Sequence, residues 1–275
     1  MNGKVDVFRK DKIINTAIRA GASKELAKKV ADEIAKKVYD GISTREILKM
    51  VKEELKKEDE HLAKVYTLKD AIASLNPEIH EFEHYIASLF SVLGYETIRS
   101  PDPKPQGKCV DHEIDVVAKK GNETIIIECK HHYKERTFTG LDVVMRQHAR
   151  MIDLNEGYEM KLKHSIKVTQ AGVVTNTQFS DYAIKYGKCR NILMMSWRYP
   201  EGKSIADVVN RTKAYPLTLL SLPLRTREML INENVRNILE FLDAEESKLR
   251  RAGIREKRIR LLKEKARNLT KIGVQ

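Results

Sequence analysis

The chain has 275 residues, a formal net charge of +12 and a sequence isoelectric point of about 9.4. It has neither an apolar run long enough to span a membrane nor an apolar signal-peptide core, so we expect a cytoplasmic protein with no membrane partner. The three cysteines are widely spaced, which excludes a disulfide framework and argues against zinc. The positive charge favours a polyanionic partner, although charge that serves only solubility is the alternative.

Residues 1–75 are expected to be helical. Apolar residues recur at helical spacing, and the breaks between the stripes carry capping residues. Ser23 is a candidate N-cap, and Ser43 with Glu46 has the spacing of a capping box. The charged run 52–60 is most simply a solvated helix surface.

Residues 76–200 alternate between helix and strand patterns. Gly121 and Asn122 lie between two β-favouring runs, which predicts a hairpin. Proline residues make 101–107 an irregular loop. The expected helices are 77–93, 140–152 and 180–186, and the further expected strands are 95–98, 171–175 and 192–195.

Residues 201–275 read as helical, with helices near 226–242 and 256–269. Between Lys248 and Lys271 there are eleven Lys or Arg residues and two acids. The run from Leu249 to Ile254 resembles a helix-hairpin-helix turn, which would present backbone N–H groups to phosphates. Under this reading the DNA contacts are Arg250, Arg251, Lys257 and Arg258. A helical subdomain that mediates dimerisation is the alternative.

The expected hairpin gathers the residues with the clearest chemistry. It brings Asp115 opposite Glu128, and alternation along the strand puts Glu128 and Lys130 on one face. Two carboxylates and an ammonium at the end of an apolar strand pair suit a divalent cation beside a phosphodiester. Other Glu-x-Lys triplets, such as the one at Glu54, lie in helical or polar surroundings. A surface salt bridge across the hairpin is the alternative.

This arrangement resembles the PD-(D/E)xK nuclease superfamily, and within it the Mrr-type restriction endonucleases. The resemblance covers about residues 78–197, and Ile114 stands where the superfamily's name has proline. The segments that carry it are Glu81-Phe82-Glu83, Leu89 to Glu96, Glu113 to Val116, Glu128-Cys129-Lys130, and Val173 to Asn176 with Phe179, Ser180 and Ala183.

The resemblance implies metal-dependent hydrolysis of DNA that leaves a 5′-phosphate. Asp115 and Glu128 would be ligands of Mg²⁺ or Mn²⁺, with the carbonyl of Cys129 as another ligand. Lys130 would orient or deprotonate the attacking water. Glu83 would complete the acid cluster and Gln147 would assist, although an ordinary helix-surface role for Glu83 stays open. His131 and His132 could touch phosphate or simply end the strand.

A second resemblance covers about residues 3–70 and is to the ATP-cone domain. It rests on Phe8, Lys12-Ile13, Ala20, Ser43-Thr44-x-Glu46-Ile47, Val51, Leu55 and Leu62-Ala63-x-x-Tyr66. It implies ATP or dATP as an effector. The family's opening strand with a Lys-Arg pair has no counterpart in Met1–Lys4. A plain helical bundle that docks on the next domain is the alternative.

The sequence therefore predicts an α/β (α+β) restriction-endonuclease-like core with a mixed central sheet, between two helical domains. The expected domains are 1–75 (ATP-cone-like), 76–200 (nuclease) and 201–275 (basic, helix-hairpin-helix-like). The predicted function is a Mg-dependent DNA endonuclease regulated by a nucleotide. A homodimer is the expected assembly, because cutting both strands of a DNA duplex needs two active sites. The alternatives are an inactive, nucleotide-sensing DNA-binding regulator and a structural protein.

Overall fold

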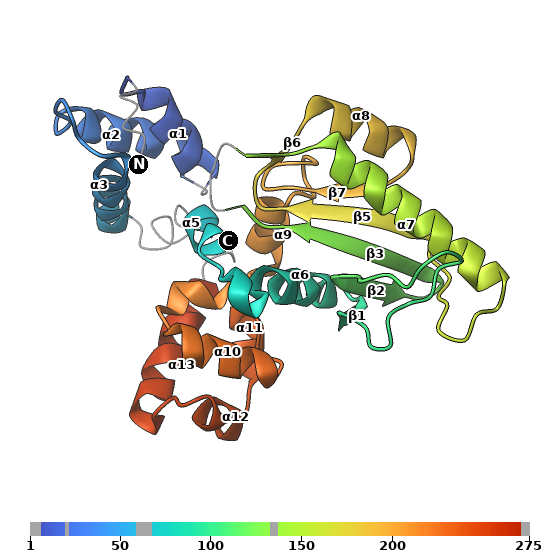
Figure 1. Ribbon diagram of the computed structural model, residues 1–275. Helices are drawn as coiled ribbons and strands as arrows, with labels where there is room; N and C mark the ends of the chain where they lie inside the picture. Colours follow the sequence, from blue (N-terminus) through green and yellow to red (C-terminus); the bar gives the residue numbers. More distant parts are fainter. Residues whose placement is uncertain (1–6, 20–21, 59–67, 133–136, 271–275) are drawn as a thin grey trace. The chain divides into compact units, whose positions relative to one another are not determined.

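A computed structural model describes residues 7–19, 22–58, 68–132 and 137–270 (Figure 1). Its contacts divide the chain into two compact units, residues 1–70 with 268–275, and residues 71–267. In the described residues no helix is both long enough and apolar enough to cross a membrane.

The N-terminal unit is built on three amphipathic helices, α1 (Lys10–Arg19), α2 (Lys24–Ala35) and α3 (Thr44–Glu58). Their apolar stripes meet in a core, so residues such as Ile34, Val51 and Leu55 are fully buried. The expected N-cap at Ser23 is confirmed, because its Oγ accepts a hydrogen bond from the Leu26 N–H at 3.1 Å.

The expected capping box is half formed. The Oγ of Ser43 accepts from the Glu46 N–H at 3.1 Å, but the Glu46 carboxylate accepts from the Tyr39 hydroxyl, also at 3.1 Å. The carboxylate is therefore used to tie the preceding loop to the helix.

The second unit contains a five-stranded sheet in the order β1-β2-β3-β5-β7. β1, β2 and β3 are antiparallel, whereas β3, β5 and β7 are parallel, so the sheet is mixed as predicted. A second, small sheet pairs β4 with β6 in parallel. The strands are β1 (Glu96–Arg99), β2 (Val116–Lys120), β3 (Glu123–Lys130), β4 (Phe138–Thr139), β5 (Gln170–Thr175), β6 (Gln178–Phe179) and β7 (Leu193–Met195).

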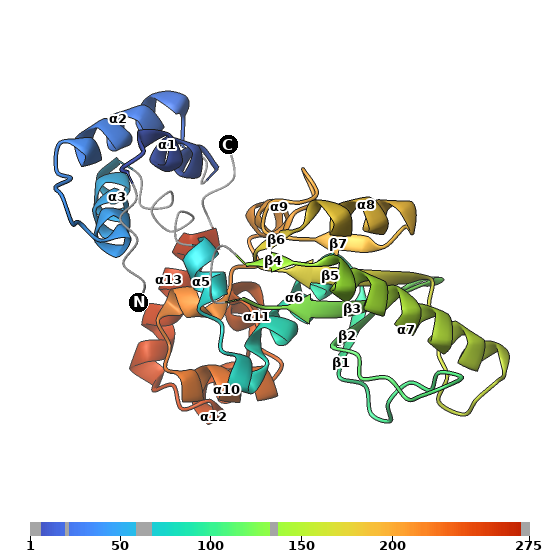
Figure 2. The same cartoon turned by 45° about the horizontal axis from the view of Figure 1, so that its top comes forward.

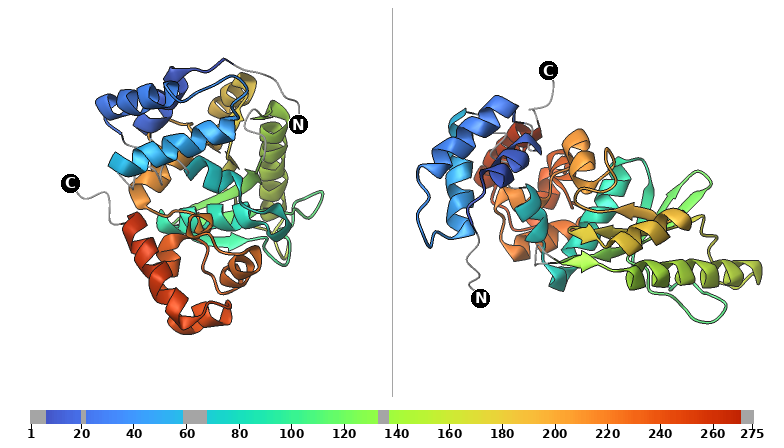
Figure 3. Two further views of the ribbon diagram at one scale, coloured as in Figure 1. Left: turned by 90° about the vertical axis from the view of Figure 1, so that its left-hand side faces the viewer. Right: turned by 90° about the horizontal axis from the view of Figure 1, so that it is seen from above.

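Helices cover both faces of this sheet (Figures 2 and 3). α6 (Glu81–Val92) lies against β1, β2 and β3, and the Ser91 and Thr97 hydroxyls are 2.8 Å apart. α7 (Leu141–Glu159) packs against β5 and against α8 (Asp181–Cys189). The buried side chains of α7 share a core with Val117 and Ile126.

The C-terminal helices of this unit are anchored to α6. The Tyr85 hydroxyl donates to the Ala214 carbonyl at 2.9 Å, and Arg227 binds the Glu81 carboxylate through Nε at 2.6 Å and Nη2 at 3.2 Å. These helical segments are α9 (Ile205–Thr212), η2 (Leu217–Leu220), α10 (Leu224–Asn232), α11 (Ile238–Asp243), α12 (Glu246–Arg251) and α13 (Glu256–Thr270). α5 (Leu68–Ala73) and η1 (Pro77–Ile79) precede α6.

Several helix predictions differ from the structure. The helix expected over 77–93 is the short helix η1 followed by α6, because His80 between them takes a left-handed conformation with φ of 49°. The helix expected over 226–242 is two helices, because the Asn237 side chain accepts from the N–H groups of Leu239 and Glu240 and starts α11 afresh. The helix expected to end at Ile152 continues to Glu159, since no glycine cap or proline stops it there. A domain boundary near residue 200 stays a prediction.

Candidate active site

The β2–β3 hairpin brings the predicted acids together. The register pairs Val116 with Ile127, so Asp115 and Glu128 are the next residues on neighbouring strands. Asp115 Oδ2 accepts a hydrogen bond from the Cys129 N–H at 2.7 Å. Lys130 Nζ lies 2.6 Å from Glu128 Oε1. The two carboxylates and the amine therefore meet at one end of the sheet.

Glu83 approaches the same place from the first turn of α6. Its Oε2 atom is buried and has no hydrogen-bond partner among the described residues, while Oε1 lies 3.8 Å from Nδ1 of His80. A buried carboxylate oxygen without a partner is expensive unless a cation or a donor reaches it. Glu83 is thus not an ordinary solvated helix residue.

The electrostatics of the acids are asymmetric. Burial raises the pKa of the Asp115 carboxyl to about 6, although the hydrogen bond from the Cys129 N–H acts to lower it. The Glu128 and Glu83 carboxylates add to the rise. Burial also acts to raise the pKa of Glu128, but hydrogen bonds from Lys130 and Arg150 hold it below its usual value. Asp115 therefore lacks countercharge, whereas Glu128 has it in excess.

Arg150 is a site residue that sequence reasoning missed. Its Nη1 lies 2.7 Å from Glu128 Oε2 and donates to Gln147 Oε1 at 2.7 Å. Gln147 is fully buried, and its Nε2 donates to the Ile126 carbonyl at 3.0 Å. Among the described contacts, Gln147 is linked to Glu128 through Arg150, which it holds in place beside that carboxylate.

The two histidines after the strand are held structurally. The His131 ring donates to the Ile72 carbonyl at 3.0 Å and contacts the Phe82 ring, with centroids 5.1 Å apart. Asn176 accepts from the His132 N–H and donates to the His132 carbonyl, both at 2.8 Å. These contacts fix the chain as it leaves Lys130, which favours the strand-end interpretation of both residues.

A divalent cation fits the donors at this end of the sheet. In the described part of the chain, no three His, Cys, Asp or Glu side chains are arranged as a ready-made metal cluster. The unpartnered Glu83 oxygen and the raised pKa of Asp115 nevertheless mark a buried region that lacks positive charge. The N–H and carbonyl of one residue in a hydrogen-bonded strand pair point to the same edge, so the Cys129 carbonyl lies on the Asp115 side.

The donor set also indicates which metal fits. Carboxylate and carbonyl oxygens suit Mg²⁺ or Mn²⁺. Burial raises the pKa of the Cys129 thiol well above its usual value.

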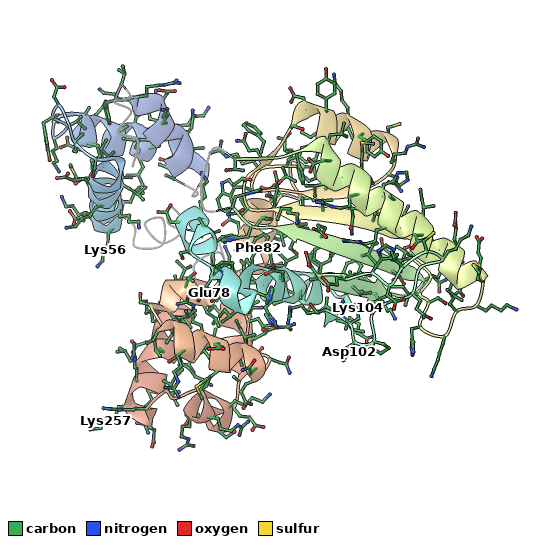
Figure 4. All side chains as sticks on the ribbon, in the orientation of Figure 1. Lys56, Glu78, Phe82, Asp102, Lys104 and Lys257 are labelled. Atoms are coloured by element: carbon green, nitrogen blue, oxygen red, sulfur yellow. The ribbon has the colours of Figure 1, made fainter. Side chains whose placement is uncertain are left out.

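The predicted DNA-contacting residues lie on α12 and α13, away from these acids in the sequence. Arg251 is engaged by Glu233 at 2.8 Å and 2.7 Å, and Arg250 lies 4.0 Å from Glu246. Lys257 is exposed and points away from the helical bundle, and Arg258 is also exposed (Figure 4). The helices α12, of 6 residues, and α13, of 15 residues, do flank a turn in which Gly253 has φ of 80°. Their contact with DNA stays a prediction.

The fold and the acid-rich strand end together define a restriction-endonuclease-like protein. A family model described as restriction endonuclease (Mrr catalytic domain) matches residues 75–197, and one described as ATP cone domain matches residues 1–72. The chain therefore belongs to the Mrr-type restriction endonucleases and has an ATP cone domain in front, as the two resemblances implied.

Two similar proteins cover most of the chain. An uncharacterized protein of Archaeoglobus fulgidus is 34% identical over 175 residues, which span 64% of this chain and 94% of that protein. The crystal structure of the protein of unknown function AF1548 superposes with a TM-score of 0.59 at 31% identity, over 70% of this chain and 99% of that chain. Both support the architecture and assign no activity.

Proposed function

We propose that this protein is a Mg-dependent endonuclease that hydrolyses DNA phosphodiester bonds. The observation that carries the proposal is the meeting of Asp115, Glu128 and Lys130 at the end of β2 and β3 in a chain of this family. The family implies a divalent metal. When bound, such an ion supplies positive charge and Lewis acidity to the phosphate.

The chain's own residues have distinct roles in this proposal. Asp115, Glu128 and the Cys129 carbonyl hold the cation, and Glu83 turns its unpartnered oxygen to the same place. The Lys130 ammonium is about one-third exposed and can orient the attacking water and offset charge on the phosphate. Water adds to phosphorus, the bond from phosphorus to O3′ breaks, and the proton lost by water balances the one gained by the leaving oxygen.

Positive charge for the DNA backbone lies beside the acids. Arg99 ends β1 opposite Val116, and the next residue, Ser100, donates its N–H to the Asp115 carbonyl at 3.1 Å. Among the described residues Arg99 has no carboxylate partner. Burial lowers the pKa of the His84 imidazole to about 4, and the positive charge of Arg99 adds to that shift. We propose Arg99 as a phosphate contact next to the cleavage site.

A cleavage assay tests the proposed activity. Supercoiled plasmid, linear duplex and branched DNA are incubated with the wild-type chain in Mg²⁺ or in chelator. We expect Mg-dependent products that Glu128→Gln and Lys130→Met abolish. Glu123→Gln is the matched control, because Glu123 lies on the same strand but at the far end, where it accepts from the Tyr95 hydroxyl at 2.7 Å. Cleavage that persists in Glu128→Gln would refute the proposal.

One observation favours the second candidate, an inactive DNA-binding regulator. Both oxygens of Glu128 are already paired, by Lys130 and by Arg150. A protein of this kind would bind DNA in a salt-dependent way and show no cleavage with any of the three DNA forms. In that case Glu128→Gln would change neither binding nor the absence of products.

The ATP cone domain leads us to propose ATP or dATP as an effector. The residues Met1–Lys4, where this sequence departs from the family's opening basic strand, lie outside the described residues, as do Leu62 and Tyr66. Titration calorimetry with ATP, dATP and a non-nucleotide polyphosphate measures the interaction directly. We expect saturable binding of a nucleotide but not of the polyphosphate, and a change in DNA cleavage or in homodimer formation on binding.

A further inference from the structure

Glu128 is held by two cations, one on each oxygen. Lys130 Nζ lies 2.6 Å from Oε1, and Arg150 Nη1 lies 2.7 Å from Oε2. Glu128 is only 8% exposed and the Arg150 side chain 16%, so water screens this pair weakly. A divalent ion that binds Glu128 must share it with one of these groups or displace one.

Arg150 is not a chance surface partner. The same Nη1 atom that contacts Glu128 donates to Gln147 Oε1, and Gln147 is fastened to the β3 backbone through the Ile126 carbonyl. The chain thus places a guanidinium on one oxygen of Glu128 through a buried amide. Lys130, by contrast, belongs to the strand motif itself and has the exposure to face a substrate.

The other acids of the site lack such a partner. Asp115 receives one backbone N–H on Oδ2, and Glu83 Oε2 receives nothing from the described residues. Both Lys130 and Arg150 therefore form ion pairs with Glu128, whereas neither Asp115 nor Glu83 forms an ion pair with a Lys or Arg among the described residues. A divalent ion that binds all three acids therefore meets Arg150 and Lys130 as competitors for the Glu128 oxygens.

We propose that Arg150 is a positioning residue that competes with the divalent cation for Glu128. It holds the Glu128 carboxylate in place when no metal is bound, and its charge thereby lowers the affinity of this site for the metal. Phosphate oxygens of bound DNA then supply the extra ligands that tip the balance toward the metal. This inference rests on the proposed function, because it takes Glu128 as a metal ligand.

Titration of the full-length chain with Mn²⁺, in the absence of DNA, tests the competition. The electron paramagnetic resonance signal of free Mn²⁺ gives the affinity without any activity readout. Arg150→Met keeps the length and removes the charge, and we expect it to bind Mn²⁺ about tenfold more tightly than the wild type. Arg150→Lys keeps the positive charge on a shorter side chain, and its Mn²⁺ affinity should lie between those of the wild type and Arg150→Met. It also provides a second variant if Arg150→Met does not fold.

Arg236→Met is the matched control. Arg236 has a side-chain exposure of 17%, close to that of Arg150, and binds the Glu240 carboxylate at 2.6 Å. It removes a buried, paired arginine from the same unit without touching Glu128. We expect its Mn²⁺ affinity to stay within about twofold of the wild type.

The outcomes separate the competition from its premise. Unchanged or weaker Mn²⁺ binding in both Arg150 variants overturns the competition, because a purely supportive arginine would weaken the site when lost. Equal tightening in Arg236→Met also overturns it, since that would be a general field effect. Glu128→Gln tests the premise: if this variant binds Mn²⁺ as the wild type does, the proposed metal site itself fails. If Glu128→Gln binds Mn²⁺ more weakly than the wild type while the Arg150 variants bind it no more tightly, only the proposed competition fails.

Discussion

Replacing Asp115 by Asn should stabilise the metal-free protein at neutral pH. Burial, with help from the nearby carboxylates, raises the pKa of Asp115 from 3.8 to about 6 in the folded state. Between these two values the folded state binds more protons than the unfolded state, so stability falls as pH rises. Above pH 6 the loss reaches about 3 kcal/mol, at about 1.4 kcal/mol per pKa unit. Asn has no charge to desolvate, and its amide oxygen can still accept from the Cys129 N–H.

Urea unfolding in chelator measures this effect. The free energy of unfolding of Asp115→Asn minus that of the wild type should be small at pH 4 and should grow to about 3 kcal/mol at pH 7.5. Asp243→Asn, at an exposed position at the end of α11, is the control and should show no such growth. Added Mn²⁺ should stabilise the wild type more than Asp115→Asn, because the neutral amide is a weaker ligand than the carboxylate that it replaces.

Two results would refute this reasoning. One is an Asn variant that is less stable than the wild type at pH 7.5 in chelator. The other is a stability difference that does not change with pH. Either would mean that Asp115 is not a buried carboxylate short of positive charge, and the argument for a cation beside it would lose its electrostatic basis.

Three further variants test other parts of the structure. Arg227→Met leaves the Glu81 carboxylate, whose side chain is 4% exposed, without its cationic partner. Urea unfolding should show a loss of about 3–5 kcal/mol in the free energy of unfolding. A loss below about 1 kcal/mol would count against the anchor between α6 and α10. Gly157→Ala places a Cβ 2.6 Å from the Gln106 carbonyl oxygen, and a loss of about 1–3 kcal/mol is expected in the same assay; an unchanged midpoint would contradict the packing of α7 on that loop. Arg99→Ala should weaken DNA binding and make its salt dependence shallower by about one phosphate contact, and an unchanged salt slope would remove Arg99 from the interface.

The hairpin could be predicted because its signals are local. Two β-favouring runs flank Gly121 and Asn122, and a turn at that point fixes the register of the whole strand pair. Once the register is fixed, Asp115 and Glu128 must be neighbours. The mixed central sheet expected for the core is confirmed.

Arg150 could not be placed with equal ease, because its contact with Glu128 joins positions 22 residues apart on different elements. One signal was present. Arg150 lies at helical spacing from Val143, Gln147 and Leu154, which are buried on one side of α7. A charged side chain on a buried stripe needs a buried partner, and the carboxylate near the end of the apolar strand β3 is the natural one.

The C-terminal region shows a different limit. The run of basic residues indicated a polyanion contact, but sequence alone could not show that Arg251 is already engaged by Glu233 or that Arg227 anchors α10 to α6. Such pairings depend on how separate helices pack. They have no periodic signature in the chain.

Diffraction from crystals soaked in Mn²⁺, recorded so that the ion scatters anomalously, tests the central claim most directly. We expect an anomalous peak within about 2.5 Å of carboxylate oxygens of Asp115 and Glu128. A peak elsewhere, or none near these two residues when the ion is in excess, would contradict a metal-dependent site at the end of β2 and β3.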